Sequence, residues 1–332
     1  LVNTNPSTAT MLDRILTVRV SRITRETAEI SAYELTHPWG RPLPPYDAGA
    51  HIDLHVPGGF MRQYSLARAG HQGQHCSSYL VGVKREAAGR GGSAALHGRV
   101  RVGDLLAISA PRNTFALHAG AQRHLLLAGG IGLTSMLAMA QQLLRQGADF
   151  TLCVFARSRE HLAFGQALAD PALAPHVRLH FDSAADDQKI DLAELLAVRA
   201  PGCHMYMCGP EGFMGAVQAA SAHWPDGCVH LEYFAAPQGA GDGGSNEAFT
   251  LVLARRGVSV AVPPDQTAAQ ALHDLGLDVP TSCEQGICGT CVVGYAGGEP
   301  EHRDFCLSAT ERKYKIALCC SRAKSGPITI DL

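Results

Sequence analysis

Several features that would place this chain in a specialised class are missing from its sequence. No apolar run approaches the roughly 18 residues that a membrane-spanning helix needs, so the sequence predicts no membrane span. The formal net charge is only −2 at pH 7, which leaves no basic surface for a nucleic acid partner. The opening residues, Leu1 to Thr10, lack the basic and apolar regions of a secretion signal and predict a disordered leader.

Cysteine, by contrast, is plentiful. The chain has 11 cysteines in 332 residues, a number that would suggest disulfides in a small secreted protein. In a long chain without a secretion signal, we expect reduced thiols in the cytoplasm instead. The hydrophobic fraction of 46% and the charged fraction of 17% favour a globular protein. Its length allows two or three domains.

The densest chemical motif lies near the end of the chain. Cys283, Cys288 and Cys291 follow the pattern C-x4-C-x2-C, and the pair Cys319-Cys320 comes further on. This is the spacing of the plant-type ligand set for a 2Fe–2S cluster, with three thiolates close together and a fourth far along the chain. Glycines within the loop would bring bare amides close to sulfur. The alternative is a structural zinc site, which usually has paired cysteine knuckles where this sequence has one.

Residues 11–118 predict an antiparallel barrel, because short alternating stretches are separated by frequent proline and glycine turns. Within them, Arg62 and Tyr64 fall on one face of a strand, and Ser65 follows. A cation beside a flat ring suits a phosphate attached to a planar heterocycle. The glycine-rich turn 89–93 opens a short helix whose free amides could bind the same phosphate. An ordinary surface strand and a flexible loop are the alternative.

Residues 119–235 change to alternating buried strands and helices, which predicts a doubly wound parallel sheet. The apolar run 124–128 leads into Gly129-Gly130-Ile131-Gly132-Leu133-Thr134 and a helix, a nucleotide-binding unit without the standard dinucleotide fingerprint. Ligands bind at the carboxyl ends of such strands, where Cys208-Gly209-Pro210 also lies. That motif could instead be a tight turn after a core cysteine. Phe234, leaving the last strand, is either a core residue or a ring that covers a flavin.

Residues 236–246 have the composition of a linker, rich in Gly, Ala, Pro and Ser. They separate off a small module, residues 247–332. A β-hairpin opens the module, and a helix with Asp265 as its N-cap follows. The cysteine loop and a final strand complete it.

The order of these motifs resembles the ferredoxin–NADP reductase superfamily, and specifically the phthalate dioxygenase reductase type of Rieske oxygenase reductases. The resemblance extends from Met11 to Leu332. It implies a multidomain chain with an FMN-binding antiparallel β-barrel in 11–118 and an NAD-binding doubly wound α/β domain in 119–235. After the linker, it implies a plant-type ferredoxin domain of the α+β β-grasp type in 247–332.

The resemblance also implies a role for each motif residue. For FMN it implies Arg62 at the phosphate, Tyr64 at the ring and Ser65 at the N5 edge, together with Gln63, Val83, Lys84, Gly91, Gly92 and Ser93. For the nicotinamide cofactor it implies Gly130, Gly132, Thr134, Arg157, Asp182, Cys208, Gly209 and Pro210. The implied catalytic residues are Ser65, Cys208 and Phe234. The motif Cys319-x-Ser-Arg makes Cys319 the fourth iron ligand, beside Cys283, Cys288 and Cys291.

By this resemblance the chain is the reductase component of a bacterial Rieske-type oxygenase or demethylase system. A hydride would pass from NADH to FMN, and single electrons would pass through the 2Fe–2S cluster to a separate Rieske non-haem iron oxygenase. A cytochrome P450 or another hydroxylase is the alternative acceptor, and a flavin-free nucleotide-sensing module is the alternative from another class. We expect NADH because Asp182 opposes a 2′-phosphate, although Arg157 and Arg159 would favour one. We also expect a cytoplasmic monomer.

Overall fold

The computed structural model describes residues 15–70, 76–87, 89–183, 189–236, 246–308 and 310–332. These residues form two compact units, the first ending at Glu232 and the second beginning at Tyr233. The expected leader and residues 237–245 of the expected linker lie outside the described part. None of the helices within the described ranges has the length and apolar content to cross a membrane.

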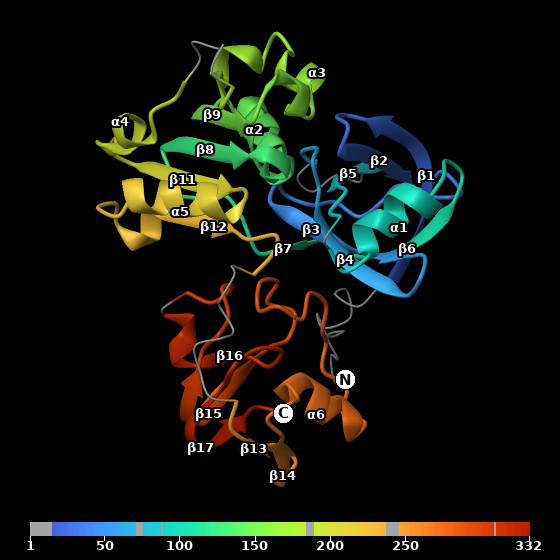
Figure 1. Cartoon of the computed structure of the whole chain (residues 1–332), viewed down its shortest axis with the longest axis vertical. Coiled ribbons are helices and arrows are strands. Elements are labelled where there is room, and N and C mark those ends of the chain that lie inside the picture. The colour runs from blue at the N-terminus through green and yellow to red at the C-terminus, as the bar shows by residue number, and fades with distance from the viewer. Residues whose placement is uncertain (1–14, 71–75, 88, 184–188, 237–245, 309) are drawn as a thin grey trace, which may run out of the picture. The chain divides into compact units, whose positions relative to one another are not determined.

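The first sheet of the first unit is the expected antiparallel barrel (Figure 1). Its strands are β1 (Ile15–Arg25), β2 (Ile30–Thr36), β3 (Ala50–Val56), β4 (Phe60–Ser65), β5 (Ser78–Lys84), β6 (Leu105–Ser109) and β7 (Arg112–Asn113). They run in the order β4-β3-β6-β1-β2-β5, with β7 paired to β3. A bridge between Leu66 and Val81 brings the two edges together, so the sheet is nearly closed. Helix α1 (Gly92–Arg99) follows β5.

Strand alternation explains the barrel interior. Ile52 and Leu54 of β3 are fully buried in the barrel core, and they pair with Tyr64 and Arg62 of β4. Arg62 and Tyr64 therefore leave β4 on one face, as expected. Directly opposed residues on antiparallel strands share a face of the sheet, so this pairing fixes the orientation of the flavin motif.

The second sheet is wholly parallel, in the order β10-β9-β8-β11-β12. Its strands are β8 (Arg123–Gly129), β9 (Asp149–Ala156), β10 (Val177–Phe181), β11 (Cys203–Cys208) and β12 (Val229–Glu232). Its α-helices are α2 (Leu133–Gln146), α3 (Gly165–Leu168), α4 (Leu192–Leu196) and α5 (Glu211–Ala220), and its 3-10 turns are η2 (Gly130–Gly132), η3 (Arg159–His161), η4 (Ala174–His176) and η5 (Asp226–Cys228). The apolar run of β8 is buried, as both faces of a parallel sheet usually are.

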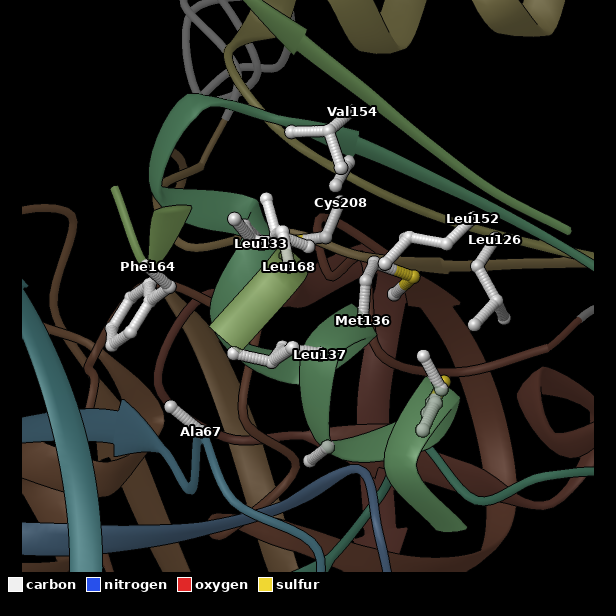
Figure 2. Packing of buried hydrophobic residues seen from close by; sticks show 14 of the residues in the cluster. Ala67, Leu126, Leu133, Met136, Leu137, Leu152, Val154, Phe164, Leu168 and Cys208 are labelled. Atoms are coloured by element: carbon white, nitrogen blue, oxygen red, sulfur yellow. The ribbon is translucent and has the colours of Figure 1, made fainter. Parts of the chain in front are cut away.

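Helix α2 packs between the parallel sheet and the barrel. Figure 2 shows its side chains in one apolar cluster, which Ala67 of the barrel joins beside Leu137 of α2. Two polar contacts fix the same junction. The Ala48 N–H donates to Gln142 Oε1 at 2.9 Å, and the Ala69 N–H donates to Gln141 Oε1 at 3.0 Å. Barrel and parallel sheet are therefore held together through α2.

The second unit is a five-stranded mixed sheet, in the order β14-β13-β17-β15-β16, with one helix. Its elements are β13 (Phe249–Leu253), β14 (Val258–Val262), α6 (Ala268–Asp274), β15 (Val292–Glu301), η6 (Glu311–Lys313), β16 (Lys315–Ala317) and β17 (Arg322–Ile330). The expected hairpin is present as β13 and β14. The expected N-cap, Asp265, is wrong: Thr267 caps α6 in a capping box with Gln270. The Thr267 hydroxyl accepts from the N–H of Gln270, a bond that satisfies an amide at the helix start.

Candidate functional site

The cysteine loop folds back on itself between α6 and β15. Gly286 and Gly289 both have φ of +72°, and Glu284 has φ of +55°. These left-handed residues turn backbone amides toward sulfur. The N–H groups of Gln285 and Thr290 donate to the sulfurs of Cys283 and Cys288, each at 3.4 Å.

The four expected iron ligands come together as two pairs. Cys283 and Cys288 are hydrogen-bonded to each other, and so are Cys291 and Cys319. The bond from the Cys283 thiol lowers the pKa of Cys288 to about 5, and the same contact raises the pKa of Cys283. The N–H of Cys319 donates to Cys291 Sγ at 3.4 Å. Three of the ligands, Cys288, Cys291 and Cys319, are buried.

This arrangement fits a 2Fe–2S cluster better than a zinc ion. Among the described residues, no three His, Cys, Asp or Glu side chains surround one point as a single metal ion would require. A 2Fe–2S cluster needs only two protein sulfurs at each iron. Two pairs of thiols whose sulfurs accept hydrogen bonds from backbone amides therefore match the ligand arrangement of such a cluster.

Cys320 and Cys306 lie beside the loop but outside the pairs. Cys320 Sγ is close to Gly286, where an added methyl group would lie only 2.6 Å from that sulfur. Cys306 is half-buried near Gly289. Cys320 is hydrogen-bonded to the Cys319 thiol, but Cys319 is the thiol that bonds to Cys291, which favours Cys319 as the fourth ligand.

In the barrel, the structure brings the two expected phosphate features together. A methyl group built at Gly92 would lie 2.7 Å from Cγ and Nε of Arg62, so the glycine allows the arginine to cross the turn. Arg62 donates to the carbonyl of Arg90 at 2.8 Å. Gly91, with φ of +82°, is the N-cap of α1 and supplies no side-chain cap. A guanidinium beside a helix start suits an anionic phosphate.

The remaining flavin candidates lie on β4, on β5 and at the start of α1. Lys84 at the end of β5 forms an ion pair with Glu86 at 2.6 Å, and Ser93 Oγ accepts from the Glu86 N–H at 3.1 Å. Val83 is buried. Tyr64 is also largely buried, and its own burial raises its pKa above the usual value. The side-chain amide nitrogen of Gln63 is buried without a hydrogen-bond partner.

The end of β4 meets the carboxyl ends of β11 and β12 at a polar cluster. Ser65 Oγ donates to Glu232 Oε2 at 3.2 Å. The Ser135 hydroxyl, at the start of α2, bonds to the same carboxyl and to Cys208. Burial raises the pKa of Glu232 to about 7 and the pKa of Cys208 well above its usual value. Both groups therefore hold their protons more tightly than they would in water.

Glu232 and Ser135 are absent from the residues proposed from the sequence. A carboxylate at the last position of a parallel strand, here the half-buried edge strand β12, is the available signal, since ligands bind at the carboxyl ends of such strands. Its partner Ser65 lies 167 positions earlier in the chain. No local pattern could join the two.

The expected nicotinamide turn packs against the expected pocket. A methyl group built at Gly132 would lie 2.1 Å from the Cys208 carbonyl oxygen, and one at Gly209 would lie 3.0 Å from Gly129 Cα. These glycines permit the two backbone turns to touch, which leaves bare amides at the sheet edge. Thr134 is buried and donates to the Ile131 carbonyl at 3.0 Å. Pro210 begins the turn into α5.

Arg157 and Asp182 follow two adjacent strands, β9 and β10. Arg157 forms an ion pair with Glu29 of the barrel at 3.0 Å. Asp182 is exposed and lies 3.3 Å from His180. Arg159 covers the ring of Phe181 at 5.3 Å. The Arg157 charge is thus already partnered, while the Asp182 carboxylate at the strand end would repel a 2′-phosphate.

Phe234, the third expected catalytic residue, belongs to the second unit and is 39% exposed. The structure brings Ser65 and Cys208 to one site through Glu232 and Ser135. It does not place Phe234 relative to that site, so the role of Phe234 stays a prediction.

Two family models match the chain. Residues 251–324 match the 2Fe-2S iron-sulfur cluster binding domain. Residues 108–225 match the N-terminal domain of dimethylamine monooxygenase subunit DmmA-like proteins. The first match includes all four paired cysteines and the second includes the nicotinamide turn.

Similarity to known proteins extends over nearly the whole chain. A vanillate O-demethylase oxidoreductase of Pseudomonas sp. (strain HR199) is 45% identical, over 96% of this chain and 100% of its own length. A solved phthalate dioxygenase reductase, described as a modular structure for electron transfer from pyridine nucleotides to [2Fe-2S], is 37% identical with a TM-score of 0.70. The match covers 96% of this chain and 98% of that one.

A third relative carries the same architecture inside a larger protein. An intact type IV self-sufficient cytochrome P450 monooxygenase is 37% identical to this chain, with a TM-score of 0.86. The match covers 96% of this chain and 41% of that one.

Proposed function

Because this chain belongs to the phthalate dioxygenase reductase family of flavin and iron–sulfur oxidoreductases, we propose that it delivers electrons from NADH to a Rieske non-haem iron oxygenase. The family confirms the class expected from the sequence, a reductase component of an oxygenase system. It also confirms the expected fold and the expected FMN, NADH and 2Fe–2S cofactors. Relatives of this kind are reductase components of multicomponent systems, which implies that the acceptor is a separate oxygenase.

One observation carries the proposal: the Ser65–Glu232–Cys208 cluster lies where the barrel meets the carboxyl ends of the parallel sheet. A hydride can pass between a flavin and a nicotinamide only if their binding elements converge. Here the strand that carries Arg62 and Tyr64 ends at the edge that carries Gly132 and Gly209. FMN, when bound, supplies the chemistry that converts a hydride into single electrons.

The chain's own residues would bind, orient and manage one proton. Arg62 and the start of α1 would hold the flavin phosphate, and Tyr64 would pack against the ring. Ser65 Oγ donates to Glu232 Oε2, so the pair can pass a proton between the flavin edge and the carboxyl. Because its pKa is about 7, Glu232 can hold or release a proton near neutral pH. Cys208 stays a neutral thiol against the nicotinamide pocket.

The second unit would take the electrons onward. Cys283 and Cys288 would hold one iron, and Cys291 and Cys319 the other. A plant-type cluster has a reduction potential near −400 mV, and a Rieske centre lies at roughly −150 to +300 mV. Electron transfer from this chain to a Rieske partner is therefore downhill.

A cytochrome P450 is the second candidate acceptor, and a specific observation favours it. The P450 monooxygenase that matches this chain with a TM-score of 0.86 contains the same architecture within one polypeptide. The presence of this architecture in a P450 monooxygenase supports a haem protein as the acceptor for reductases with the same domains.

The test reconstitutes the purified reductase with FMN, iron and sulfide, and adds NADH. A purified Rieske oxygenase and a purified P450 are offered in separate reactions under anaerobic conditions. The proposal expects the Rieske absorbance to bleach at a rate that saturates with oxygenase concentration. Reduction of the P450 alone would assign the second candidate.

We also propose a cytoplasmic monomer. All 11 cysteines are free thiols, which supports a reducing compartment. Light scattering of the loaded protein tests the oligomeric state against the chain mass of 35.2 kDa.

A further inference from the structure

A turn of the barrel brings a carboxylate to the edge of the parallel sheet at which nucleotides are expected to bind. Residues 26–29 connect β1 to β2. At the end of this turn, Glu29 Oε2 lies 3.0 Å from Nη2 of Arg157, the residue directly after β9. The expected cofactor arginine therefore has its counter-charge on the barrel, in another part of the same unit.

Hydrogen bonds hold the turn in this place. The Glu29 N–H donates to Thr27 Oγ1 at 3.2 Å, and the Glu29 carbonyl accepts from the Arg85 N–H at 2.8 Å. Glu26 Oε2 accepts from the Phe164 N–H at 2.9 Å, which is a second contact between the turn and the α/β part of the unit. Because its backbone is bonded on both sides, Glu29 keeps its carboxylate near Arg157.

Arg157 lies where such a sheet distinguishes two cofactors. In nucleotide-binding sheets, an acidic residue at this edge bonds to the ribose 2′-hydroxyl of NADH, and a nearby arginine accommodates the 2′-phosphate of NADPH. Arg157 and Asp182 occupy neighbouring strand ends. The Asp182 N–H donates to the Ala156 carbonyl at 3.1 Å, and the Ser183 N–H donates to the Arg157 carbonyl at 3.0 Å. Both kinds of residue are therefore present at one edge.

Two other arginines near this edge make contacts of a different kind. Arg25 donates to the carbonyls of Thr27 and Ala28 in the same turn, at 3.4 Å and 3.5 Å. The Arg159 guanidinium lies over the Phe181 ring, 5.3 Å from its centroid. Of the three arginines, Arg157 is the one that forms an ion pair with a carboxylate.

We propose that Glu29 determines the choice of nicotinamide cofactor, because by neutralising Arg157 it keeps that guanidinium from binding the 2′-phosphate of NADPH. Glu29 acts through Arg157 and is a positioning residue. Asp182 acts at the same edge by its own negative charge. The inference rests on the proposed function, since it assumes that the nicotinamide cofactor binds at this edge.

The exposure of the pair sets the size of the effect. The Arg157 and Glu29 side chains are 61% and 45% exposed, so water weakens their charges. In water, removing one unit charge about 4 Å from another changes an equilibrium about fivefold. Salt reduces such an effect, because the screening length falls from about 30 Å at 0.01 M to about 3 Å at 1 M.

Equilibrium binding tests the proposal without turnover. The probes are 5′-AMP and 2′,5′-ADP, which differ only by the 2′-phosphate, and calorimetry measures their affinities for the full chain loaded with FMN and cluster. Glu29→Gln should raise the affinity for 2′,5′-ADP relative to 5′-AMP about fivefold at low salt, and 1 M KCl should abolish most of this gain. An unchanged ratio, or a gain that persists at 1 M KCl, would overturn the inference.

A second substitution shows whether the effect passes through Arg157. The double variant Glu29→Gln with Arg157→Gln has the net charge of the parent chain, and it should lose the gain seen in Glu29→Gln. Stopped-flow reduction of the flavin by NADPH and by NADH should show the same shift in the ratio of kcat/KM. A gain that survives removal of Arg157 would contradict the proposal.

Asp149→Asn is the matched control. It breaks an exposed ion pair of similar kind, in which Arg123 lies 2.7 Å from Asp149 at the amino ends of β8 and β9. The ratio of the two affinities should stay at the parent value, and a fivefold shift would overturn the inference. Failure of the parent chain to bind either nucleotide would contradict the proposed function and the inference with it. Binding of both with an unchanged ratio in Glu29→Gln would overturn the inference alone.

Discussion

At the scale of single residues, the charge of the Glu232 carboxyl depends on folding. Burial raises its pKa from 4.5 to about 7, while bonds from Ser135 and Ser65 act in the other direction. The folded chain therefore binds this proton more tightly than the unfolded chain does. The stability that follows is complete below pH 4.5 and is lost as pH rises through about 7.

We predict that Glu232→Gln removes this pH dependence. The parent chain should lose up to about 3 kcal/mol of unfolding free energy between pH 5 and pH 8 relative to the variant. Urea unfolding at the two pH values measures the difference. In the loaded protein, the step near pH 7 in the rate of flavin reduction should also disappear. Glu194→Gln, on exposed α4, is the control, and an unchanged pH profile in Glu232→Gln would exclude a titrating role.

The choice between two neighbouring thiols is also made at this scale. Cys319 is buried and bonded to Cys291, whereas Cys320 is half-buried and its sulfur lies against Gly286. We predict that Cys319→Ser loses the cluster but keeps NADH reduction of the flavin. Iron and sulfide content, with the visible spectrum, measure the loss.

Cys320→Ser is the matched variant, one residue further along the chain. It should retain iron and sulfide at the level of the parent chain. Retention in Cys319→Ser together with loss in Cys320→Ser would show that the ligand assignment is wrong.

At the scale of elements, Gly82 of β5 controls how closely the barrel approaches α2. A methyl group built there would lie 2.7 Å from Thr134 Cγ2 and 2.9 Å from the Phe164 ring. Both neighbours are buried, so they have little room to move. Phe164 is itself strained, with φ of +56°.

We predict that Gly82→Ala destabilises the first unit by about 1–3 kcal/mol through overpacking. The variant should also bind NADH more weakly, because the nicotinamide turn begins α2. Thermal unfolding and NADH titration measure the two effects. Gly215→Ala in α5 is the control, since nothing lies within 4 Å of its added methyl group. Equal stability of the two variants would contradict the argument.

Element prediction from the sequence succeeded where periodicity was strong and local. The apolar run of β8 and the helix α2 follow their expected patterns, whereas β3 does not alternate in burial, because His51 and Asp53 are buried as well as Ile52 and Leu54. Strand β15 is absent from the elements predicted from the sequence, and it contains Gly297, Gly298 and Pro300, which have low strand propensity. Pairing with β17 overrides that tendency, with register shifts at these residues. Gly298 is required there because a methyl group would lie 2.4 Å from the Pro327 carbonyl oxygen.

Site residues, like helices and strands, could be predicted where the signal is local in the sequence. The cysteine loop and the Arg62 strand are local motifs, so their residues could be proposed from the sequence, whereas the choice of Cys319 and the flavin roles came from the family resemblance. The Glu232 cluster depends on three strands and a helix start that are far apart in the sequence. The N-cap of α6 was a local signal that was misassigned, since Thr267 and Gln270 form the capping box that Asp265 lacks.

At the scale of the whole molecule, the composition of the chain and its folded structure place the boundary between the two units at different residues. Linker composition begins at residue 236, whereas the second unit already begins at Tyr233. The few residues between them carry the ring that meets Phe305. Composition alone therefore does not mark where the second unit begins.

The measurement that tests the central claim most directly is an anaerobic NADH titration of the full chain loaded with FMN, iron and sulfide. Absorbance follows the flavin, and electron paramagnetic resonance follows the reduced cluster. The account predicts that both centres are reduced, with about 1.5 equivalents of NADH per chain, because FMN takes two electrons and the cluster one. A flavin that bleaches while the cluster stays oxidised, or a chain that takes up neither cofactor, would contradict it.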